Sequence, residues 1–259
     1  MEVYLIVCLA ALAGSGLTLF SGFGLGTILV PVFGLFFEVE VAIALTAIVH
    51  LLNNLFKLTL LGKHANREVL LRFGVPSVLA AFLGAWLLKG LSGAEAITSY
   101  SMMNHQFEIY PVKLVIGALL LVFAIAEWSP ALNKLELDRK YLPLGGLLSG
   151  FFGGLSGNQG ALRTAFLMKS GLTKEQFIST GVVLACFIDI TRLPVYGSSF
   201  SQQLETSEIP LIISATLSAF LGAWAGTRFL KKTTHHVVKT VVTFLLLAYG
   251  SALIMGWLK

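Results

Sequence analysis

Charged residues are scarce in this chain: only 12% of its 259 residues are Asp, Glu, Lys or Arg, whereas 56% are hydrophobic. A soluble domain carries about 25% charged residues, so this composition excludes an ordinary soluble globular protein. The mean hydropathy is +0.84, and apolar runs of membrane-spanning length recur along the whole chain. These features predict an all-α integral membrane protein with several passes through the lipid bilayer of the cell (inner or plasma) membrane. The net charge of +5 does not indicate nucleic-acid binding, because basic residues of membrane proteins gather on cytoplasmic loops.

Cysteine is also rare, and Cys8 and Cys186 both lie in apolar runs. Two such thiols provide neither a disulfide framework nor the spacing of a metal site. A metal carrier would need acids, histidines or thiolates clustered in its spans, and the spans contain few of them. The glycines at 22–26 have no βαβ unit around them, and the chain has no nucleophile elbow. We therefore expect no metal, no cofactor and no enzymatic activity.

Ten apolar segments follow one another along the sequence. They span residues 3–20, 27–37, 41–61, 70–90, 111–128, 142–155, 160–170, 175–195, 208–230 and 236–257. The segments 27–37 and 160–170 are short, since about 11 helical residues rise only about 16 Å, roughly half the thickness of the hydrocarbon layer. Glycine-rich turns precede both, SGFGLG at 21–26 and SGNQG at 156–160. This pattern predicts broken or re-entrant helices.

The chain contains an internal repeat. The string FLGAW occurs at 82–86 and again at 220–224. Further matches in the same order pair Gly26 with Gly160, Asn54 with Asp189 and Lys57 with Arg192. The repeat predicts two homologous halves of five segments each, 1–128 and 142–259, joined by a cytoplasmic linker at 129–141 and forming one transport domain.

An odd number of crossings in each half places the halves in opposite orientations. The fold class is thus an inverted-repeat helical bundle, the architecture of many secondary transporters. Basic residues concentrate on one set of loops, which we assign to the cytoplasm: Lys63, Arg67, Lys134, Arg139, Lys140, Lys169, Lys174, Arg228, Lys231 and Lys232. Both termini and the loops at 91–110 and 196–207 are then extracytoplasmic.

Helix breaks inside a membrane must be buried in protein or line a cavity, and their free N–H groups attract anions. Four glycines, Gly24, Gly26, Gly157 and Gly160, would let the backbone approach a ligand. In LSGNQGALRTAFL (155–167), Asn158, Gln159 and Arg163 would contact it. The alternative is that Asn158 caps the helix and Arg163 extends to the cytoplasmic surface.

Two other intramembrane groups belong to the predicted anion site. His50, Asn54 and Lys57 share one helix face, and Asp189 and Arg192 are spaced to pair at i and i+3. Lys57 and Arg192 would attract the anion. Asp189 would orient Arg192 or carry a proton, with His50 as a second proton carrier. The alternative is a structural Asp189–Arg192 pair and a Lys57 that extends to the membrane surface.

Three stretches, SGFGLGTILVP, VEVAIALTAIVHLLNN and GLSGNQGALRTAFLMKSGLTKEQFISTGVVLACFIDITRLPVY, resemble the two halves of the TauE/SafE sulfite-exporter family. In the second half an Asn-Gln-Gly turn replaces the usual glycine cluster. The resemblance implies an exporter of sulfite, sulfoacetate or another organosulfonate. The departure at Asn158, Gln159 and Arg163 leaves a larger or differently charged anion open.

The sequence therefore predicts a secondary transporter that exports a small sulfur-containing anion by alternating access. A passive anion channel and a carrier of another small organic anion remain alternatives. A coupling proton and a homodimer are both compatible with this architecture.

Overall fold

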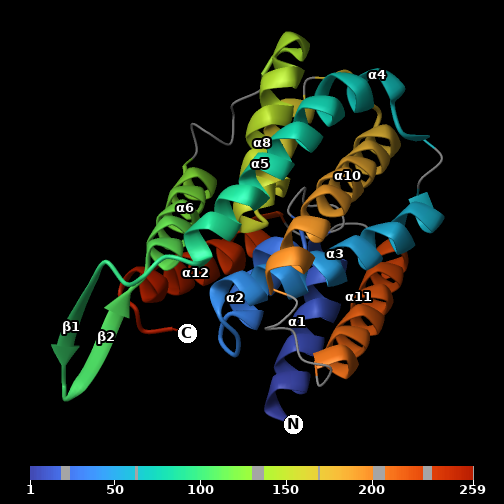
Figure 1. Ribbon diagram of the computed structural model, residues 1–259. Helices are drawn as coiled ribbons and strands as arrows, with labels where there is room; N and C mark the ends of the chain where they lie inside the picture. The colour runs from blue at the N-terminus through green and yellow to red at the C-terminus, as the bar shows by residue number, and fades with distance from the viewer. Residues whose placement is uncertain are drawn as a thin grey trace.

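The computed structural model describes residues 1–18, 24–61, 64–129, 137–168, 170–200, 208–229 and 235–258, and is shown in Figure 1. Its helices are α1 (Glu2–Thr18), α2 (Gly26–Phe33), α3 (Val39–Leu61), α4 (Arg67–Val69), α5 (Val75–Ser92), α6 (Pro111–Trp128), α8 (Leu142–Ser156), α9 (Gly160–Leu167), α10 (Lys174–Phe200), α11 (Ile209–Phe229) and α12 (His235–Ile254). A π-helical turn at Leu70–Gly74 joins α4 to α5, and a 3-10 turn at Arg139–Tyr141 precedes α8. Each of the ten apolar segments corresponds to one of these helices.

Several sequence predictions fall on residues outside the described ranges. They are the start of the first glycine turn at 21–23, most of the linker at 130–136, part of the loop at 201–207, and the basic residues Lys63, Lys134, Lys169, Lys231 and Lys232.

The described part of the chain contains five helices long and apolar enough to cross a membrane. They are Val39–Leu60, Arg67–Ser92, Pro111–Trp128, Lys174–Ser199 and Ile209–Arg228. Helix α1 and residues Val238–Ile254 of α12 are apolar but shorter. The protein is therefore a mostly helical, multi-pass membrane protein.

The two short helices, α2 and α9, have eight residues each, which corresponds to a rise of about 12 Å. Both are shorter than predicted, because the chain leaves the helix at Gly34 and at Met168. All eight residues of α2 are buried. Helix α2 packs against α1, α3 and α12 in the interior of the bundle (Figure 1).

The prediction of an all-α protein was wrong in one region. Strands β1 (Thr98–Met102) and β2 (His105–Ile109) form an antiparallel hairpin within the predicted loop at 91–110. Its two turn residues, Met103 and Asn104, have φ values of 50° and 63°. Positive φ at both central residues is typical of a type I′ turn, which usually carries Asn-Gly or Asp-Gly. A Met-Asn turn lacks that signature, so the hairpin had no clear signal in the sequence.

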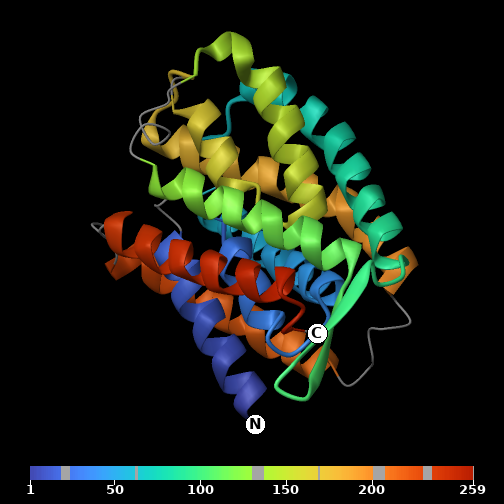
Figure 2. The same cartoon turned by 90° about the vertical axis from the view of Figure 1, so that its left-hand side faces the viewer.

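The hairpin is attached to the end of the chain, and Figure 2 shows it beside the C-terminus. The Tyr100 hydroxyl donates a hydrogen bond of 2.6 Å to the Met255 carbonyl oxygen. The Trp257 indole nitrogen donates to the Tyr100 hydroxyl at 3.2 Å. Lys113 Nζ at the start of α6 donates to the Leu258 carbonyl at 3.0 Å. These bonds hold the residues after α12 against the hairpin and α6.

Close backbone contact at glycines holds pairs of long helices together. Three glycines of α8, spaced four residues apart, face the segment from the π-helical turn into α5. A Cβ added to Gly146, Gly150 or Gly154 would lie 2.1, 2.2 or 2.1 Å from the carbonyl oxygen of Phe73, Ser77 or Ala81, respectively. Only glycine permits this approach, which is a common means of helix association in membranes.

The repeated FLGAW strings serve the same purpose. A Cβ on Gly84 would lie 2.1 Å from the Phe151 carbonyl oxygen of α8, and a Cβ on Gly222 would lie 2.1 Å from the Leu12 carbonyl oxygen of α1. Both strings are therefore packing surfaces between helices.

Candidate functional site

The two helix breaks meet in the interior of the bundle. A Cβ built on Gly26, the first residue of α2, lies 3.1 Å from the Gly157 carbonyl oxygen in the turn before α9. Gly157 has a φ of +79° and ends α8, with its N–H bonded to the Gly153 carbonyl at 3.0 Å. Glycine adopts this left-handed conformation without strain. The breaks predicted in separate halves of the sequence are therefore in contact.

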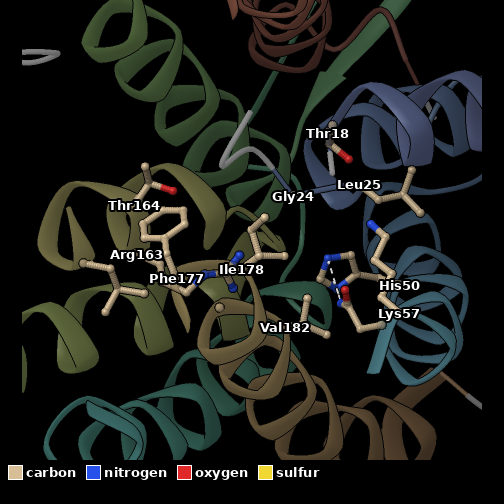
Figure 3. A pocket seen from close by; sticks show the side chains of 13 residues that line it. Thr18, Gly24, Leu25, His50, Lys57, Arg163, Thr164, Phe177, Ile178 and Val182 are labelled. Carbon is tan, nitrogen blue, oxygen red and sulfur yellow. Dashed lines mark hydrogen bonds between the residues drawn. The ribbon is translucent and has the colours of Figure 1, made fainter. Parts of the chain in front are cut away.

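A cavity of about 50 Å³ lies beside this contact. Residues from both halves line it: His50, Asn54 and Lys57 from α3, Gly24 before α2, and Arg163 from α9. Figure 3 shows Arg163 and His50 entering the cavity from opposite sides, with Lys57 on the same side as His50. Both walls of the cavity thus carry groups that donate hydrogen bonds.

The cavity contains two buried cationic side chains. Lys57 is 5% exposed and Arg163 is 9% exposed. Neither forms an ion pair with a carboxylate in the described part of the chain. The Arg163 guanidinium donates a hydrogen bond from Nη1 to Gln159 Oε1 at 3.4 Å. Burial of a cation is costly unless an opposite charge offsets it, so this cavity favours an anion.

The carboxylate that contacts His50, a lining residue of this cavity, already has hydrogen-bond partners in the protein. Asp189 is fully buried; its Oδ2 lies 2.6 Å from His50 Nδ1, and its Oδ1 accepts hydrogen bonds from Arg192 Nε at 3.0 Å and Nη2 at 2.8 Å. Gln159 Nε2 donates to the same Oδ1 at 3.4 Å, and Arg192 Nη1 donates to the Gly153 carbonyl at 3.0 Å. The predicted Asp189–Arg192 pair is confirmed. It links α10 to the break and to α8.

His50 connects this network to the cavity. Asp189 accepts from His50 Nδ1, and the other ring nitrogen, Nε2, faces the cavity, 3.5 Å from where a Cβ added to Gly24 would lie. Asn54 Nδ2 lies 3.3 Å from the same Nε2. The Asp189 carboxylate therefore fixes the orientation of the His50 ring from the side away from the cavity, as is usual for functional histidines.

The structure separates the predicted site residues into groups. The cavity is lined by Gly24, His50, Asn54, Lys57 and Arg163. Gln159, Asp189 and Arg192 lie behind it in the hydrogen-bonded network. Gly26 and Gly157 form the contact between the breaks, and Gly160 begins α9.

The structure contradicts the alternative roles of Asn158, Lys57 and Arg163, whereas the Asp189–Arg192 pair is present. The N-cap of α9 is Gln159, without a side-chain capping bond, so Asn158 does not cap this helix. Lys57 and Arg163 are buried in the protein and do not extend to its surface.

Three supporting residues gave no signal in the sequence. Ser149 Oγ donates to the Gln159 carbonyl at 3.0 Å, and the Tyr196 hydroxyl donates to the Gly154 carbonyl. A Cβ on Gly181 would lie 3.5 Å from Arg163 Nε, so the glycine leaves room for the guanidinium. Only the packing identifies these three residues as part of the surroundings of the site.

Comparison with known proteins now decides the family. The sequence matches the family model of the sulfite exporter TauE/SafE over residues 6–253. The chain belongs to the TauE/SafE family. The match includes both halves and both helix breaks, which confirms the resemblance found in the sequence. This TauE/SafE protein is a multi-pass membrane transporter. No curated protein matches the chain.

One predicted residue of this TauE/SafE transporter faces elsewhere. Asn158 does not line the cavity with Lys57 and Arg163 but a second one of about 10 Å³, together with Thr27 and Glu127. The neighbouring Gln159 bonds to Arg163 of the first cavity. Asn158 and Gln159, consecutive residues of one break, are therefore connected to two different cavities.

Proposed function

We propose that this transporter exports a small sulfur-containing oxyanion, and that the anion binds between Lys57 and Arg163. One observation carries the proposal: each half contributes a buried cation to one cavity, and neither cation has a carboxylate ion-pair partner in the described residues. An oxyanion would accept hydrogen bonds from both side chains. Such charge-assisted bonds are about twice as strong as neutral ones.

The size of the cavity supports a compact ligand. Its volume of about 50 Å³ is several times the about 10–15 Å³ that one water molecule requires. The cavity therefore favours a compact inorganic oxyanion such as sulfite over a larger anion. A sulfonate with a carbon chain, such as sulfoacetate, would require the cavity to widen.

The hydrogen-bonded network behind the cavity has a positioning role in this proposal. Asp189 holds His50 and Arg192, and Gln159 connects Asp189 to Arg163. Arg192 is already neutralised by Asp189, so Lys57 and Arg163 supply the positive charge that faces the anion.

Helix pairing supports an inverted repeat of residues 1–128 and 142–259 around the linker 129–141. The repeat equates α1 with α8, α2 with α9, α3 with α10, α5 with α11 and α6 with α12. Under this correspondence the closely packed pair α5–α8 becomes α11–α1, which is also closely packed, and the pairs α3–α10 and α6–α12 map onto themselves. This exchange is what a two-fold axis relating the halves would produce. Rocking of such halves around a fixed site is a common basis of alternating access.

In this proposal the basic loops are cytoplasmic, both termini are extracytoplasmic, and the anion leaves the cytoplasm. An inside-negative potential assists the export of an anion by about 2.3 kcal/mol per charge per 100 mV.

Sulfite flux through purified protein in lipid vesicles tests the proposal. Lys57→Met and Arg163→Met should each lower the flux at least about tenfold, because a lost hydrogen bond to a charged group is worth about 1.5–3 kcal/mol. Arg139→Met is the control, since Arg139 pairs with Glu68 on the exposed surface.

Counterflow distinguishes the carrier from a channel. Unlabelled sulfite inside the vesicles should accelerate the entry of labelled sulfite through a carrier and should not through a channel. Full activity of both variants would refute the site, and absence of sulfite flux through the wild type would refute the substrate.

A further inference from the structure

A second cavity lies on the α6 and α12 side of the helix breaks. Its walls come from α2 (Thr27), α9 (Ala161), α6 (Phe123 and Glu127) and α12 (Val242 and Leu246), with Asn158 of the break between α8 and α9. Its volume of about 10 Å³ suffices for one water molecule and is too small for an oxyanion. The first cavity is instead lined by α1, α3, α9, α10 and the residues just before α2. The two cavities therefore both have α9 as a wall, and the break between α8 and α9 lines the second cavity.

The Asn158 side chain is the strongest sign that this cavity has a ligand. The residue is 5% exposed, and neither its amide nitrogen nor its amide oxygen has a hydrogen-bond partner. Leaving such groups unpaired costs about 1–3 kcal/mol each, so a buried amide is normally satisfied. An amide can donate to a carboxylate and accept from a protonated carboxyl group.

Glu127 supplies the carboxyl group of this cavity. It lies in the last turn of α6, where the negative end of the helix dipole disfavours a second negative charge. Ionisable residues inside membrane spans are rare and commonly mark ion or proton paths. The other walls carry one hydroxyl, that of Thr27, which donates to the Gly24 carbonyl at 2.6 Å.

The surrounding charges favour a proton as the ligand of Glu127. Helix α2 has no charged residue, and Arg163 of α9 faces the other cavity. Lys239 of α12 is one charged side chain whose field acts on Glu127. A sodium ion would need about six oxygen ligands, as hard cations do, and the apolar walls provide few. A proton needs only the carboxyl group and one polar neighbour.

We propose that Glu127 is the proton-binding site that couples anion export to proton entry, and that Asn158 transmits its protonation state to the anion site. A proton binds a carboxylate oxygen of Glu127, and the carboxyl O–H then donates to the Asn158 side-chain oxygen. When the proton leaves, the Asn158 amide nitrogen donates to the carboxylate instead. The change reaches the anion through Gln159, the next residue, which bonds to both Arg163 and Asp189.

This inference rests on the proposed anion transport, and two assays on the same vesicles distinguish the two. Counterflow of labelled sulfite at equal pH reports the anion site. Accumulation driven by a pH gradient at zero membrane potential reports the coupling. Comparison of variants at identical pH values removes the effect of the titration of sulfite itself.

In Glu127→Gln, the counterflow rate should stay within about twofold of the wild type. The accumulation driven by the pH gradient should fall at least about tenfold. Asn158→Ala should shift the pH at which counterflow is half-maximal, an effect that a purely structural role would not produce. Glu95→Gln, which changes an exposed carboxylate outside the helices, should leave both assays unchanged.

Gradient-driven accumulation that persists in Glu127→Gln would overturn the inference. Accumulation that follows a sodium gradient instead of a pH gradient would also overturn it. Absence of counterflow in the wild type would refute the proposed anion transport.

Discussion

Removal of the Asp189 carboxylate should destabilise the whole bundle. In Asp189→Asn the side chain keeps its shape and loses its charge, so the Arg192 guanidinium, which is fully buried, keeps its positive charge without a counter-ion. Breaking a buried pair by neutralising one partner costs about 3–5 kcal/mol. The loss also weakens the contact with His50 on α3, which joins the two halves at 2.6 Å.

A double variant separates charge from packing. Asp189→Asn combined with Arg192→Gln leaves no unpaired charge and still permits hydrogen bonds between the two side chains. It should recover most of the loss, because replacement of both members of a buried pair is often close to neutral. Arg192→Gln alone should cost less than Asp189→Asn alone, since Asp189 retains His50 as a partner.

Thermal unfolding in detergent measures these differences. A chain of this length loses about 2–4 °C of melting temperature per kcal/mol, so Asp189→Asn should melt roughly 6–20 °C below the wild type. A variant that melts within 2 °C of the wild type would refute the argument. So would a double variant that is no more stable than Asp189→Asn, because the loss would then come from packing and not from an unpaired charge.

Local patterns in the sequence predicted much of this architecture. Long apolar runs located the helices, because a membrane span must satisfy its backbone hydrogen bonds internally. Glycine clusters before the short segments located both breaks, and the i, i+3 spacing of Asp189 and Arg192 predicted their ion pair. Each of these features depends on residues close together in the chain.

Features that depend on contacts between the halves were not predictable in the same way. The His50–Asp189 hydrogen bond joins residues 139 positions apart, and only the packing of α3 against α10 brings them together. The division of Asn158 and Gln159 between two cavities depends on how the chain turns after Gly157, which has a φ of +79°. Glu127 lies in no recognisable motif. The packing of α6 and α12 against the break brings it next to Asn158.

Two further substitutions test the close approach of the backbones. Gly154→Leu should prevent stable folding, because a Cβ at this position already lies 2.1 Å from the Ala81 carbonyl oxygen; overpacking typically costs about 1–3 kcal/mol, and contact with backbone leaves little room for relief. Gly90→Ala in α5 is its control, since no atom lies within 4 Å of the new methyl group and melting should be unchanged or slightly higher. Gly157→Ala should act on the site itself, because the left-handed backbone disfavours alanine by about 1–2 kcal/mol and the new methyl group would lie 3.3 Å from Arg192 Nη1. Relief of this strain displaces either the turn at Asn158 and Gln159 or the Arg192 side chain, so sulfite counterflow should fall more than tenfold while the protein remains folded. Normal counterflow in Gly157→Ala would show that the geometry of the break does not position the anion site.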